Sequence, residues 1–273
     1  MFANDSTLRI RFATSVLLAA PSVAGVIWLP TFGVACVWGV VLGLAAWEWG
    51  WLLGGSPRAR AGYLLWSTLA AAMLLALPWE IRIYWLGLGL PLWLYAAAVV
   101  LRYERTGLPP GSRARLAFAL LALPLAAAAL VSLHERAGAS ACLALFALVW
   151  AGDSFAYLIG KRFGRWRMAP LVSPGKTWEG SLSACVLAPL VAGASAWMLE
   201  APVSAWTPFL LWLAPVTVIG LTGDLYESLV KRVAGTKDSG VLLPGHGGAF
   251  DRLDSLIAAA PAFVVLLPFD HLP

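Results

Sequence analysis

Long runs of apolar residues constrain the fold of this chain more than any other feature. A helix needs about 20 residues to cross the hydrocarbon core of a bilayer. Nine runs approach or exceed this length, at roughly 10–29, 31–54, 62–79, 82–101, 115–134, 138–160, 180–199, 205–230 and 254–270. Only 12% of the residues are charged, against about 25% in soluble domains. Because backbone groups in lipid must be satisfied within their own segment, the sequence predicts an all-α, polytopic membrane protein with about nine transmembrane helices.

The basic residues support this count and orient the chain. If the N-terminus and every second loop lie on one side, that side holds seventeen of the nineteen Lys and Arg, and the other side holds only Arg82 and Arg136. Cytoplasmic loops carry an excess of Lys and Arg. We therefore expect the N-terminus in the cytoplasm, the C-terminus outside, and the protein in a cytoplasmic (inner) membrane. The net charge of +5 fits lipid headgroups and phosphate ligands better than nucleic acid, since the basic residues lie in short loops between apolar runs.

Polar residues divide the chain into two regions. Residues 1–135 hold five predicted helices, whereas residues 136–273 hold four helices and two long polar loops, 161–179 and 231–253. Binding and catalytic residues often lie on loops that a rigid scaffold positions. The second region is therefore the candidate catalytic region.

The main polar constellation lies between residues 224 and 254. Helical spacing places Asp224, Ser228 and Lys231 on one face, and Asp251 and Asp254 on one face of the next helix. An acid inside an apolar helix is costly unless it faces a polar cavity or a cation, and converging carboxylates suit a hard cation such as Mg²⁺. The alternative is an interfacial loop in which acids and bases pair with each other, but Asp224 gains little from such pairing.

Bases and glycines surround these acids. The bases are Lys231, Arg232, Lys237 and Arg252. Acids that hold a metal beside bases that bind phosphate oxygens are typical of a metal–phosphate site. The glycines after Pro244 allow the backbone to approach a ligand closely. His246, considered alone, is more often a structural hydrogen-bonding residue.

A second constellation spans residues 173–180. Its Gly175-Lys176-Thr177 run is not a P-loop, because residue 170 is Pro where that motif needs Gly and because an apolar helix precedes it in place of a strand. Lys176 and a hydroxyl could still bind a nucleotide phosphate, whereas Ser173 or Thr177 could instead cap the next helix. The roles of Glu48 and Asp153, both inside apolar runs, stay open.

Together these residues resemble the phosphatidate cytidylyltransferase (CDP-diglyceride synthase) family. The residues that match its signature are Ser228, Lys231, Arg232, Lys237, Asp238, His246, Gly247, Gly248, Asp251, Arg252 and Asp254. Residues 173–180 and 223–225 also resemble the family, while the first five runs match it only in being apolar.

The resemblance implies a nucleotidyltransferase of phospholipid biosynthesis. It would convert CTP and phosphatidate to CDP-diacylglycerol and pyrophosphate with Mg²⁺, and a second metal ion is left open. It would work as a homodimer among membrane lipids. The implied catalytic residues are Asp224, Ser228, Lys231, Lys237, Asp238, His246, Asp251 and Arg252. The implied metal ligands are Asp224, Asp251 and Asp254. The implied substrate-binding residues are Ser173, Lys176, Thr177, Arg232, Gly247 and Gly248.

Two other functions compete with this one. A CTP-dependent lipid kinase would release CDP in place of pyrophosphate. A transporter would also carry acids within its membrane helices, but here the polar residues crowd the cytoplasmic end and no internal repeat is evident.

Overall fold

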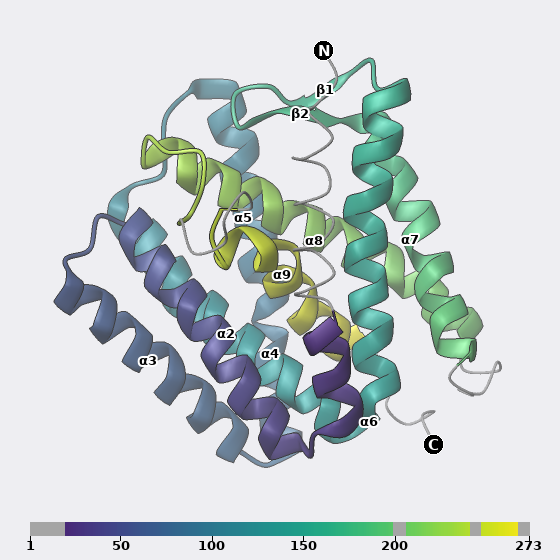
Figure 1. Ribbon diagram of the computed structural model, residues 1–273. Coiled ribbons are helices and arrows are strands. Elements are labelled where there is room, and N and C mark those ends of the chain that lie inside the picture. The colour runs from purple at the N-terminus through teal and green to yellow at the C-terminus, as the bar shows by residue number, and fades with distance from the viewer. Residues whose placement is uncertain (1–19, 199–205, 241–246, 267–273) are drawn as a thin grey trace.

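The computed structural model describes residues 20–198, 206–240 and 247–266, which form a helical bundle with one two-stranded sheet (Figure 1). A helical segment at 20–28 comes first. The elements that follow are α2 (Thr31–Leu52), α3 (Pro57–Ala76), α4 (Trp79–Gly87), α5 (Gly89–Thr106), α6 (Ser112–Phe163), β1 (Arg167–Ala169), β2 (Ser173–Thr177), α7 (Trp178–Met198), α8 (Trp206–Val233) and α9 (Phe250–Leu266).

The predicted all-α class is confirmed, and the apolar runs coincide with helices. The run at 82–101 forms α4 and α5, which meet at Leu88, and the first run is described only from residue 20. Four segments of the described chain have the length and hydropathy needed to cross a membrane: α2, α3, α4 with α5, and α6. The finer count of nine transmembrane helices stays a prediction.

Helix α6 contains two of the predicted runs. Its 52 residues would extend about 78 Å if straight, more than twice the hydrocarbon core at about 30 Å. Gly138 divides it with a non-helical backbone at φ 70° and ψ −168°. Glycine adopts such a positive φ without the steric cost that a side chain imposes. The helix can therefore turn back at Gly138, and both of its ends lie at the hairpin end of the bundle (Figure 1).

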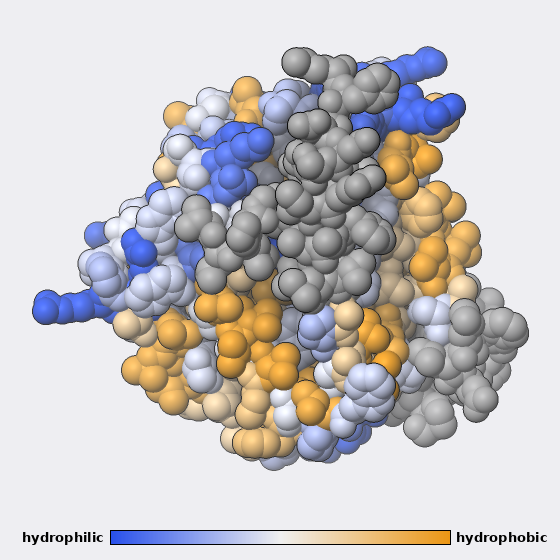
Figure 2. Space-filling model, in the orientation of Figure 1, coloured by the Kyte–Doolittle hydropathy of each residue, from blue (hydrophilic) through white to orange (hydrophobic). Residues whose placement is uncertain are grey.

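The surface matches a membrane environment. Phe32, Tyr84 and Trp28 are each more than three-quarters exposed. Figure 2 shows hydrophobic residues over the lower part of this face, with hydrophilic residues toward the end at which β1 and β2 lie in Figure 1. Exposed apolar patches of this size are rare on soluble monomers. The several long apolar helices and this surface together indicate a membrane protein.

Helix α9 lies in the middle of the bundle, where small residues allow close packing (Figure 1). Ala258, Ala260 and Ala262 are fully buried. A Cβ atom added at Gly223 of α8 would lie 2.5 Å from the carbonyl oxygen of Asp254 and 2.7 Å from the Cβ of Ala258. Small residues are what lets helix backbones approach in this way. The contact brings the polar end of α8 against the first turns of α9.

Replacing Gly223 with Ala is expected to destabilise the protein by about 1–3 kcal/mol, because the new methyl group forces backbone atoms of α9 to shift. The measurement is thermal unfolding of the purified protein in detergent. Gly62→Ala is the matched control, since a Cβ there meets nothing within 4 Å and Ala favours a helix over Gly. Equal stability of the two variants would contradict the close contact of α8 with α9.

The polar loop predicted at 161–179 contains a β-hairpin. Strands β1 and β2 pair antiparallel, with Arg167 opposite Thr177 and Ala169 opposite Ser173. The hairpin is tied to α5 and α8. Glu104 of α5 accepts the backbone N–H groups of Leu171 and Val172 at 3.1 and 2.8 Å, and Arg232 Nε donates to the Val172 carbonyl at 3.2 Å. These contacts fix the turn against the end of the bundle.

Candidate active site

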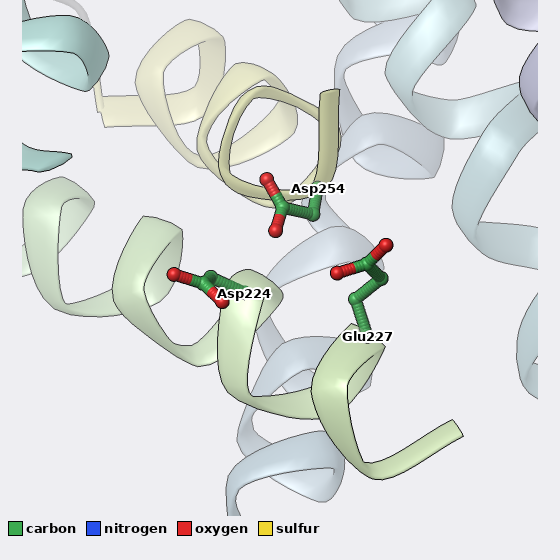
Figure 3. Close-up of side chains that lie close together, drawn as sticks. All are labelled: Asp224, Glu227 and Asp254. Carbon is green, nitrogen blue, oxygen red and sulfur yellow. The ribbon is translucent and has the colours of Figure 1, made fainter. Parts of the chain in front are cut away.

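Three carboxylates from two helices converge where α8 touches α9. Asp224, Glu227 and Asp254 each offer an oxygen, and these oxygens lie within 4.8 Å of one another. Figure 3 shows Asp224 and Glu227 on successive turns of α8, with Asp254 facing them from α9. Like charges this close are costly unless a cation or a proton lies among them. We call this group the acidic cluster.

The acidic cluster fits a divalent metal ion. Glu227 is only 2% exposed, and its Oε1 has no hydrogen-bond partner in the described part of the chain. A buried carboxylate oxygen without a partner is destabilising, and a bound cation would remove that penalty. All the donors are carboxylate oxygens, which are the ligands that Mg²⁺ prefers.

Two lysines flank the acidic cluster. Lys176 Nζ, at the end of β2, lies 2.5 Å from Asp224 Oδ2, and its side chain is 16% exposed. Lys231 Nζ lies 2.8 Å from Glu227 Oε2 and 2.6 Å from Asp251 Oδ1. The hairpin and α8 therefore place one ammonium group on each side of the three acids.

The predicted faces of both helices are present. Ser228 Oγ lies 3.5 Å from Asp224 Oδ1, as their spacing of four residues requires. Asp153 of α6 accepts a hydrogen bond from the Ser255 hydroxyl at 3.2 Å, which places it next to Asp254 in the chain. Asp153 thus belongs to the surroundings of the acidic cluster.

Asp251, an expected metal ligand, is engaged elsewhere. Its Oδ2 accepts the backbone N–H groups of Ser239 and Gly248 at 2.9 and 2.8 Å, while its Oδ1 contacts Lys231. Gly247 has φ +81°, and a Cβ there would lie 2.4 Å from Asp251 Oδ2. The chain around Ser239 and Gly248 therefore folds over this carboxylate, and Glu227 takes the third place in the acidic cluster.

Several other predicted substrate contacts have different surroundings. Thr177 is buried, and its hydroxyl accepts the N–H of Gly180 at 3.3 Å, so it caps α7, which is one of the two roles expected for it. Arg232 contacts the hairpin turn, and the N–H of Gly248 already bonds Asp251. None of these three groups points at the acidic cluster as expected.

The remaining predicted residues surround the site more loosely. Lys237 and Asp238 are exposed in the loop after α8, Arg252 is exposed in the first turn of α9, and Ser173 is partly exposed in β2. His246 lies outside the described residues.

Sequence reasoning missed two residues of the site. Glu227 lies three residues after Asp224 and four before Lys231, so the same helical spacing could have identified it. Ser239 carries no signal in the sequence, because only folding brings it to Asp251.

Comparison with known proteins covers nearly the whole chain. The profile of the cytidylyltransferase family matches residues 9–269. The phosphatidate cytidylyltransferase of Pseudomonas aeruginosa is 39% identical over 263 residues, which cover 95% of this chain and 97% of that protein. Those of Haemophilus influenzae and Synechocystis are 46% and 49% identical over 125 residues. These two matches cover 44% and 45% of this chain, and 43% and 42% of the relatives.

Proposed function

The chain belongs to the cytidylyltransferase family, and from that premise we propose how its residues carry out the reaction. The protein is a nucleotidyltransferase that transfers the cytidylyl group of CTP to phosphatidate and yields CDP-diacylglycerol and pyrophosphate. The observation that carries the assignment of the site is the acidic cluster, flanked by Lys176 and Lys231, in a chain that matches a phosphatidate cytidylyltransferase over 95% of its length.

Asp224, Glu227 and Asp254 would hold Mg²⁺, and a second metal ion is left open. When bound, Mg²⁺ offsets negative charge on the nucleotide phosphates and on the departing pyrophosphate. The partnerless oxygen of Glu227 and the all-oxygen donor set support this assignment. In this proposal Asp251 orients Lys231 and the backbone around Gly248 and does not bind the metal directly.

The protein needs no nucleophile of its own. A phosphate oxygen of phosphatidate attacks the α-phosphorus of CTP, a new P–O bond forms, and the bond to the bridging oxygen breaks with its electron pair leaving on pyrophosphate. The protein must neutralise two anions and hold them in line. Lys176 and Lys231 are placed to do so, since their ammonium groups border the acidic cluster. The exposed Lys237 and Arg252 would bind the outer phosphate oxygens.

The lipid substrate fits the apolar surface of the bundle. Its acyl chains would stay in the membrane while its phosphate reaches the polar end that carries the hairpin and the acidic cluster. Because seventeen of nineteen basic residues fall on one side of the nine predicted helices, we place this end in the cytoplasm, where CTP is available. The proposal includes an inner-membrane location and a homodimer.

One assay separates this function from its rivals. Purified protein in mixed micelles receives CTP, Mg²⁺ and phosphatidate, and both pyrophosphate and CDP-diacylglycerol are measured. Equal amounts of the two products are expected. Release of CDP with a phosphorylated lipid would indicate a CTP-dependent kinase instead. Ion flux in proteoliposomes without CTP, and no product, would indicate a transporter.

Replacing Lys176 with Gln is expected to lower kcat/KM for CTP roughly 10- to 100-fold, because a charge-assisted contact to phosphate contributes about 1.5–3 kcal/mol. Initial rates over a range of CTP concentrations measure the effect. Lys161→Gln is the control, since Lys161 is exposed at the same end of α6 and contacts Tyr157. Equal rates in both variants would remove Lys176 from the nucleotide site.

A further inference from the structure

We propose that Glu48 of α2 is a positioning residue for cytidylyl transfer, because its carboxylate fixes the first turn of α9 and, through it, Asp251 and Asp254. This inference rests on the proposed function of the acidic cluster. It gives a role to a residue from the N-terminal region, which resembles known relatives only in being apolar.

Glu48 caps α9 from another helix. It is 4% exposed, and its Oε1 accepts the N–H of Ala249 at 3.1 Å while its Oε2 accepts the N–H of Phe250 at 2.9 Å. The first N–H groups of a helix have no partner within that helix, and a local Ser, Thr, Asp or Asn usually supplies one. Residue 249 is Ala, which has no acceptor in its side chain, so the carboxylate from α2 takes this place.

The chain around the start of α9 is shaped to enclose this carboxylate. A Cβ atom added at Gly240 would lie 2.4 Å from Glu48 Oε1, and one at Gly248 would lie 2.2 Å from Glu48 Oε2. Both positions therefore need glycine for Glu48 to fit. Burial of a carboxylate is costly unless it is fully hydrogen-bonded, and the two N–H groups with the hydroxyl of Ser239 provide three donors.

Ser239 links Glu48 to the catalytic side chains. Its Oγ lies 2.9 Å from Glu48 Oε2 and 3.0 Å from Asp251 Oδ2. Asp251 in turn contacts Lys231, which contacts Glu227 of the acidic cluster. Glu48 itself does not belong to the cluster, so it acts through the placement of α9 and Asp251.

An aromatic contact strengthens the same attachment. Trp49, the next residue of α2, stacks on Phe250 with ring centroids 4.5 Å apart and an interplanar angle of 29°. The polar contact of Glu48 and the apolar contact of Trp49 hold the same turn of α9. A change at Glu48 alone therefore leaves an anchor that keeps the helix in the bundle.

The test compares Glu48→Gln with the wild type in three measurements. Gln keeps the shape but turns one acceptor into a donor that opposes a backbone N–H. We expect kcat to fall about tenfold, as for residues that orient metal ligands, with an unchanged unfolding temperature. Mn²⁺ binding, followed by electron paramagnetic resonance without substrate, should weaken about tenfold by the same reasoning. Hydrogen exchange at Ala249 and Phe250 should become faster, with little change in the rest of α9.

Two further variants make the result decisive. Glu80→Gln changes an exposed glutamate in the first turn of α4 and should alter none of the three measurements. Ser239→Ala keeps the cap but removes the bridging hydroxyl, so it should weaken Mn²⁺ binding with little change in exchange at Phe250.

Unchanged Mn²⁺ binding and exchange in Glu48→Gln would overturn the proposal. Faster exchange throughout the bundle with a lower unfolding temperature would also overturn it, because Glu48 would then be a general structural residue. If Glu48→Gln does not fold, unchanged Mn²⁺ binding in Ser239→Ala would overturn it. Failure of the wild type to form pyrophosphate would refute the proposed function alone, since metal binding and exchange are measured without turnover.

Discussion

Replacing Asp224 with Asn is expected to reduce CDP-diacylglycerol synthesis at least about 10³-fold, which corresponds to about 4 kcal/mol of lost transition-state stabilisation. Asp224 lies at the centre of the site, where it contributes to the acidic cluster, pairs with Lys176 and contacts Ser228. Asn has nearly the same shape but no charge. The change removes a metal ligand and leaves Lys176 without its ion-pair partner, while the packing of α8 is kept.

The measurement is pyrophosphate release by purified protein, together with its unfolding temperature. A normal unfolding temperature shows that the loss is catalytic. Glu80→Gln, which also removes one negative charge but at an exposed position, should keep full activity. Near-normal turnover of Asp224→Asn would sink the metal-binding role of the acidic cluster.

The sequence predicted the helices because each one is recorded in its own residues. Apolar length and the lack of an alternating pattern do not depend on the rest of the fold. The hairpin was missed for the opposite reason. Its strands have three and five residues, and its turn is fixed by Glu104 and Arg232, which lie far from it in the sequence. No local pattern reports such contacts.

The same distinction explains the outcome for the site. Helical spacing correctly paired Asp224 with Ser228, because both lie on one helix. It could not show that Gly223 lets α9 approach so closely that Asp254 meets Asp224 and Glu227. Glu48 lies 191 residues before Ser239, and spacing along a chain does not say which helices become neighbours. Its role could be read only from the folded protein.

Replacing Glu227 with Gln is expected to lower turnover at a fixed, low Mg²⁺ concentration about 100-fold, since a metal ligand is lost while the site keeps its shape. Glu227 is almost fully buried, and its free Oε1 faces no other donor among the described residues. Because the defect is in metal binding, raising the Mg²⁺ concentration should restore part of the activity. Turnover as a function of Mg²⁺ concentration measures this effect.

Asp251→Asn is the informative comparison, because spacing alone made Asp251 the expected ligand. Its two oxygens already bind Lys231 and the backbone of Ser239 and Gly248. Loss of its charge should therefore lower the maximal rate, and added Mg²⁺ should not restore it. Both variants keep Lys231 beside one remaining carboxylate, so a difference between them reports the metal and not the lysine. If Mg²⁺ instead restores Asp251→Asn and not Glu227→Gln, Asp251 is the ligand, and Lys231 must leave it when the metal binds.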